Sequence, residues 1–118
     1  MTVKGARLSL ADLRCVAEML AEYGRTTIQI DERIRGTHDE EWCSHVGEKW
    51  TSILFCASKD YSGSAAPFRL ICVSVFRSKV FISASDDSTV ALGVMYKILS
   101  LVQDAVPRWY KLHLLASV

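Results

Sequence analysis

Residues 68–85 read FRLICVSVFRSKVFISAS, and the fold class of the chain follows chiefly from them. Side chains alternate in character over 68–76 and again over 80–84, with Arg77-Ser78-Lys79 between the two runs. A period of two is typical of a β-strand, whose successive side chains point to opposite faces of the sheet. Strands joined by so short a turn must be antiparallel. The stretch therefore predicts a β-hairpin.

Two further strands are expected upstream of the hairpin. In Thr26–Arg35 isoleucines alternate with charged and amide residues, and Glu32 is the single departure from the pattern. We interpret this range as one half-buried strand whose other face meets water. Trp50–Ala57 is mostly apolar from Ile53 onward, which favours a central strand. The sequence thus predicts four strands.

An amphipathic helix is expected over Leu8–Tyr23, because its apolar residues recur at steps of three and four. Ser9 is the expected N-cap, with Asp12 completing a variant of the capping box. Gly24 supplies the expected stop.

A second long helix follows Ser85-Asp86-Asp87-Ser88 and ends before Pro107. Acidic and hydroxyl side chains accept the free N–H groups of a helix start, so we interpret the Asp86–Asp87 pair as capping rather than acid–base chemistry. A short helix is expected after Thr37, with Trp42 on its inner side and Gly47 at its end.

The order of these elements predicts an α+β fold. We expect one domain over residues 1–118: a two-layer sandwich with a four-stranded, mainly antiparallel sheet and two long helices on one face. The tail, 106–118, suits a docked helix or an added strand equally well, and it could instead dock on a partner.

Composition restricts the classes of function and the cellular compartments that we expect for the chain. The formal net charge is +1, from 14 basic and 13 acidic residues, without the basic surplus typical of nucleic-acid binding. No apolar run approaches the roughly 20 residues of a membrane span, and the first residues lack the apolar core of a secretory signal. Cys15, Cys43, Cys56 and Cys72 show no CxxC spacing and are predicted to be free thiols. We expect a soluble cytoplasmic protein without a cofactor.

The densest group of potential metal ligands lies between residues 38 and 45. His38, Cys43 and His45 are the candidate zinc ligands, with acidic residues among them. A regular helix would not let all three converge, so a solvated acidic helix start is the favoured interpretation. Cys43 as a nucleophile is disfavoured too, because residues two apart on a helix do not face each other. No phosphate loop, GxSxG or HExxH motif is present.

The tail is more apolar than a frayed terminus should be. Its candidate interface residues are Trp109, Tyr110, Leu112, Leu114 and Leu115. We therefore predict a small protein-interaction or oligomerisation module that binds a protein partner or forms a homodimer. The alternative is a small metal-dependent or ligand-binding enzyme using the 38–45 cluster. A third reading, weak nucleic-acid binding, rests on 108–111, where aromatic and cationic residues adjoin.

Overall fold

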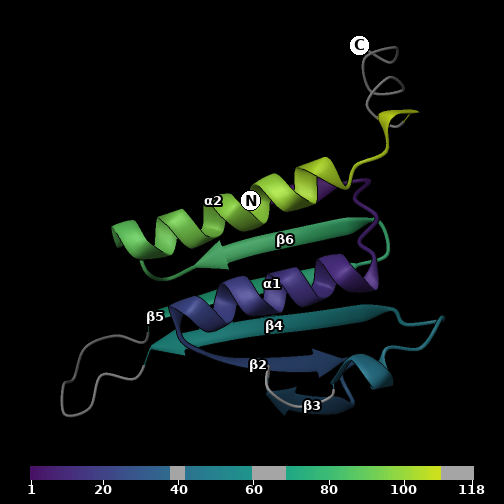
Figure 1. Ribbon diagram of the computed structural model, residues 1–118, viewed down its shortest axis with the longest axis horizontal. Helices are drawn as coiled ribbons and strands as arrows, with labels where there is room; N and C mark the ends of the chain where they lie inside the picture. The colour runs from purple at the N-terminus through teal and green to yellow at the C-terminus, as the bar shows by residue number, and fades with distance from the viewer. Residues whose placement is uncertain (38–41, 60–68, 110–118) are drawn as a thin grey trace.

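The computed structural model of the chain describes residues 1–37, 42–59 and 69–109. In chain order, the elements of these ranges are β1 (Thr2–Lys4), α1 (Leu10–Tyr23), β2 (Arg25–Ile30), β3 (Ile34–Thr37), the 3₁₀ helix η1 (Trp42–His45), β4 (Ser52–Lys59), β5 (Arg69–Phe76), β6 (Lys79–Ala84) and α2 (Thr89–Asp104). Both helices lie across one face of a single sheet (Figure 1). The predicted α+β class, with two long helices, is confirmed.

The sheet is larger than the sequence predicts. Its described strands number six, in the order β1-β6-β5-β4-β2-β3, and every neighbouring pair is antiparallel. The predicted hairpin is β5–β6, with Ser74 opposite Phe81 and Val75 opposite Val80. The prediction of four strands was wrong, for two separate reasons.

The first reason is a turn inside Thr26–Arg35. Asp31 and Glu32 have φ values of 52° and 62°, and the Arg33 N–H donates to the Ile30 carbonyl at 3.0 Å. Two successive positive φ values and this hydrogen bond are typical of a type I′ turn, here with Arg33 as an extra residue before β3, and the turn joins β2 to β3 as a hairpin. Ile30 and Ile34 lie directly opposite each other across it. The alternation of isoleucines with polar residues therefore continues through the turn. Within this range, Glu32 is the single residue that departs from the pattern and so indicates that the chain reverses direction.

The second reason is β1, whose Thr2, Val3 and Lys4 pair with Phe81, Val80 and Lys79. Three residues are too few to display a period of two, so the sequence pattern could not reveal this edge strand.

The helix starts agree closely with the sequence. The Ser9 N–H donates to the Asp12 carboxylate at 2.9 Å, and the Asp12 N–H donates to the Ser9 hydroxyl at 3.2 Å, which completes the expected capping box. Ser88 caps α2 by accepting the Ala91 N–H at 3.3 Å. α1 begins at Leu10, two residues later than expected, and α2 ends before Pro107 as expected.

The expected short helix is a single 3₁₀ turn that ends at His45, before Gly47. Thr37 belongs to β3, and the remainder of the expected capping box lies outside the described residues. Trp42 is buried, and its ring meets Phe55 edge-to-face at 5.7 Å. The turn therefore anchors one end of the core.

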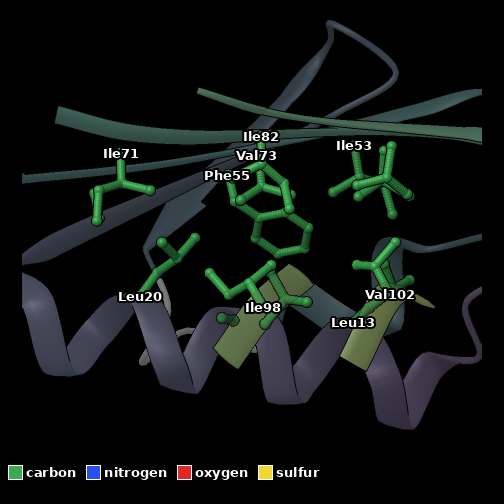
Figure 2. Packing of buried hydrophobic residues seen from close by; sticks show 14 of the residues in the cluster. Leu13, Leu20, Ile53, Phe55, Ile71, Val73, Ile82, Ile98 and Val102 are labelled. Atoms are coloured by element: carbon green, nitrogen blue, oxygen red, sulfur yellow. The ribbon is translucent and has the colours of Figure 1, made fainter. Parts of the chain in front are cut away.

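Side chains between the helices and the sheet form the core (Figure 2). Leu20 of α1 points toward Ile71 and Ile98 of α2 toward Phe55, while Leu13 of α1 lies on the side of Ile53 (Figure 2). All six are at most 1% exposed. The inward residues of β4 and β5 alternate with outward ones along each strand. One face of the sheet is thus buried, while in the described structure no element covers the other.

Candidate functional site

The candidate metal ligands are described only in part. Cys43 and His45 lie on η1, whereas His38 lies outside the described residues. His45 is exposed, and the half-buried Cys43 sulfur accepts a hydrogen bond from the Arg14 Nε at 3.2 Å. Within ranges 1–37, 42–59 and 69–109, no three His, Cys, Asp or Glu side chains are placed to hold a metal ion. The structure thus describes two of the three candidate ligands, and the metal site at 38–45 stays the alternative to the favoured interpretation of a solvated acidic helix start.

Asp86, from the acidic pair, has a structural role. It is 6% exposed, the Tyr23 hydroxyl donates to its carboxylate at 2.6 Å, and the Ser88 N–H donates at 2.9 Å. These bonds hold the pKa of Asp86 below its ordinary value, the Tyr23 bond being the larger cause. The carboxylate ties the end of α1 to the start of α2. It therefore acts as a cap and a tether between the two helices.

The predicted tail interface lies mostly beyond the described chain. Trp109 is 57% exposed, and the Arg7 guanidinium lies over its ring at 5.5 Å. Tyr110, Leu112, Leu114 and Leu115 lie outside the described residues. A contact between this tail and a partner stays a prediction.

A hollow of about 580 Å³ lies between the two helices on their outer side. Asp12, Lys97 and Asp104 line it together with small and apolar side chains. The Asp12 carboxylate is committed to the capping box, and the Lys97 ammonium lies 3.9 Å from the Glu22 carboxylate. Two of its three charged side chains, those of Asp12 and Lys97, thus have local partners, and the hollow has the character of a solvated groove between helices.

The uncovered side of the sheet has a different character, and we call it the open face. It comprises the side chains of β2, β4, β5 and β6 that alternate with the buried ones. Its central members are Thr27, Gln29, Leu54, Cys56, Cys72, Ser74, Phe76, Phe81 and Ser83. None of these nine is charged. A solvated sheet face ordinarily carries polar and charged residues, so an uncharged centre is unusual.

Two aromatic rings stand on the open face. Phe76 is 43% exposed and Phe81 is 40% exposed, and their rings meet edge-to-face at 5.8 Å. This is a favourable geometry for an aromatic pair. The two rings form a ridge across β5 and β6 that keeps much of its apolar surface in contact with solvent.

A hollow of about 400 Å³ adjoins the ridge. Its walls include Gln29 of β2, Leu54 of β4, Ser74 and Phe76 of β5, and Glu32 of the β2–β3 turn. Since Phe76 belongs to both features, the ridge and the hollow lie side by side on one surface.

Cys56 and Cys72 occupy the middle of the open face. They lie directly opposite each other on β4 and β5, and their sulfur atoms are 3.0 Å apart. Burial, followed by the hydrogen bond and charge of Cys72, raises the pKa of Cys56 to about 12. Two half-buried thiols in contact therefore lie at the centre of the uncharged surface.

Sequence reasoning missed this surface although part of its pattern is readable. Leu70, Cys72, Ser74 and Phe76 share one parity of the β5 run, and no charge interrupts them. Which parity faces away from the helices depends on the packing of distant elements, and the pattern within one strand does not contain that information.

Comparison of the chain with protein-family models, curated proteins and solved structures found no match. Among the described residues, no helix has the length and apolar character needed to cross a membrane. The function is therefore argued from the geometry of the chain itself.

Proposed function

We propose that the protein is a self-associating interaction module in which the open face binds the same face of a second copy. The observation that carries the proposal is the uncharged centre of this face, with Phe76 and Phe81 partly exposed upon it. Exposed apolar patches with a polar margin are typical of surfaces that bind other proteins.

The distribution of charge supports an interface. Arg25, Lys4 and Lys79 lie at exposed positions toward the margins of the open face, outside the uncharged centre. Protein interfaces have the same anatomy, because their cores are depleted of charge and their rims are polar. A strongly charged partner would find no complementary charge at the centre.

The size of the face suits a second copy. With a rise of about 3.3 Å per residue and a strand spacing of about 4.8 Å, the four strands of the open face cover roughly 440 Å² per copy. The whole sheet, with β1 and β3 at its edges, covers roughly 550 Å² per copy, or about 1,100 Å² for two, so a second copy would also cover the edge strands. A specific interface needs about 1,000 Å² in total.

Shape also favours a second copy over an unrelated partner. In a two-fold dimer the same patch serves both subunits, so it must be complementary to itself. The open face presents a ridge, Phe76 with Phe81, beside a hollow that Leu54 and Ser74 help to line. Each copy thus offers both a projection and a recess.

Sedimentation velocity of three purified chains tests the proposal. We expect the wild type to dimerise with rising concentration and Phe81→Lys to weaken the dimer about a hundredfold, or roughly 3 kcal/mol, because the charge would be buried without a partner. Leu92→Lys is the matched control, since Leu92 on α2 is 43% exposed and Phe81 is 40% exposed. That control should dimerise like the wild type.

Three outcomes would contradict the proposal. They are a wild type that stays monomeric at every concentration, a dimer lost in Leu92→Lys but kept in Phe81→Lys, and a dimer lost when the chain is shortened to end at residue 109. The last result would place the contact in the tail, as the sequence predicts. Thermal unfolding of each variant shows that a lost dimer is not a lost fold.

A further inference from the structure

We propose that Cys56 and Cys72 form a two-thiol oxidation site, which peroxides convert into a disulfide between β4 and β5. This inference does not rest on self-association, because it concerns two residues of one chain. It is carried by the register of the two strands, the contact between the sulfur atoms and the place of both on the open face.

The backbone already meets the requirements of a disulfide. Directly opposite residues of antiparallel strands have Cα atoms about 4.5–5.5 Å apart, within the range of about 4.4–6.8 Å found for disulfides. Cys56 and Cys72 are such a pair, with sulfur atoms 3.0 Å apart. The bond thus requires a rotation of side chains and no movement of the strands.

Solvent can reach the pair. Cys56 and Cys72 are half-buried and point away from the helices, whereas their neighbours Phe55 and Val73 are fully buried beneath α1 and α2. A small oxidant such as hydrogen peroxide therefore approaches from the open face without an opening of the core.

The contact between the two sulfur atoms fixes how the pair reacts. The thiolate is the reactive form of cysteine, so the thiol that ionises makes the first attack on the oxidant, and its neighbour resolves the sulfenic acid.

The reaction then balances in two steps. The thiolate of one cysteine attacks one oxygen of hydrogen peroxide, the O–O bond breaks, and the departing hydroxide takes up a proton to become water while that cysteine becomes a sulfenic acid. The sulfur of the other cysteine next attacks the sulfenic sulfur, the S–O bond breaks, and the departing hydroxide leaves as water with the proton of the attacking thiol. Two thiols and one peroxide give one disulfide and two waters.

Mass spectrometry of the Cys15→Ser/Cys43→Ser chain tests the site, since this variant retains only the pair in question. After dilute treatment with one equivalent of hydrogen peroxide, we expect the intact chain to lose two hydrogen atoms and a digest to contain the 56–72 linkage. A phosphine reductant should restore the original mass. The oxidised chain should unfold several degrees higher than the reduced one, because the bond restricts the unfolded chain.

Single variants test whether both thiols are needed. Cys56→Ser and Cys72→Ser should each stop with one added oxygen on the remaining thiol, trapped by a diketone that reacts with sulfenic acids, and neither should form a disulfide within the chain. The site is refuted if the pair remains reduced while Cys15 of the wild type is oxidised, or if disulfides form only between chains. Because a dimer through the open face would shield the pair from peroxide, the chain is oxidised at a concentration where it is monomeric. Failure of the proposed function therefore leaves this test intact.

Discussion

Gly24 lies where the end of α1 approaches β4 more closely than any side chain allows. A Cβ atom placed there would be 2.3 Å from the Ser58 carbonyl oxygen. The φ of Gly24 is −174°, so the requirement is space and not backbone conformation. The glycine expected from the sequence only as a helix stop therefore also lets α1 and β4 come together.

We expect Gly24→Ala to destabilise the protein by about 1–3 kcal/mol, because the strand must shift away from the new methyl group. Gly93→Ala is the control, since a Cβ at Gly93 of α2 meets nothing within 4 Å. The control should gain about 0.5–1 kcal/mol from helix propensity. Urea unfolding measures the change in the free energy of unfolding for both variants. Equal changes in the two variants would contradict the close approach of α1 to β4 at Gly24.

The Tyr23–Asp86 bond predicts a pH dependence of stability. The folded-state pKa of Asp86 is lowered from 3.8, first by the Tyr23 hydroxyl. A lowered pKa means that the ionised carboxylate stabilises the fold above the ordinary value and loses this contribution as the pH falls through the folded value. Asp86→Asn should therefore be less stable than the wild type at neutral pH. The difference between their free energies of unfolding should become smaller as the pH falls.

The measurement is the free energy of unfolding of wild type, Asp86→Asn and Tyr23→Phe across the acid range. Tyr23→Phe should also make the free energy of unfolding less dependent on pH, because it removes the main cause of the lowered pKa of Asp86. A gap between wild type and Asp86→Asn that is constant with pH would contradict the assignment.

At this scale, the sequence predicts caps well because a cap is local. Ser9, Asp12 and Ser88 lie within three residues of the N–H groups that they bind. The partner of Asp86 is 63 residues away, so no local pattern could name Tyr23.

The β2–β3 turn shows the same limit at the scale of an element. Two residues with positive φ ordinarily call for Asn-Gly, yet the turn is Asp31-Glu32. The cost of the positive φ values is offset by hydrogen bonds, because the Asp31 carboxylate accepts the Thr51 N–H at 2.6 Å and the Ser52 N–H at 3.0 Å. The turn is thus held by β4, a tertiary contact that sequence patterns within 26–35 do not display.

We expect Glu32→Gly to stabilise the protein by about 1 kcal/mol, because it removes the cost of a left-handed conformation in a residue with a side chain. Arg33→Gly, one residue away and without a positive φ, should lower stability instead. Thermal unfolding distinguishes them. A loss of stability in Glu32→Gly would argue against the type I′ turn.

At the scale of the whole molecule, the sequence predicts the class of fold because long amphipathic helices and alternating strands carry strong periodicity. It does not predict the open face, since Cys56, Cys72 and Phe81 are ordinary residues within their own strands. They form a surface only after β4, β5 and β6 align and both helices cover the opposite side. The candidate site is therefore a property of the assembled sheet.

The most direct test of self-association through the open face is thiol alkylation as a function of protein concentration, read by mass spectrometry under reducing conditions. We expect Cys56 and Cys72 to become slower to alkylate as the dimer forms. Cys15, exposed on α1, should react at an unchanged rate and serves as the internal control. Alkylation rates at Cys56 and Cys72 that do not change while the protein dimerises would contradict self-association through the open face, as would protection of Cys15 alone.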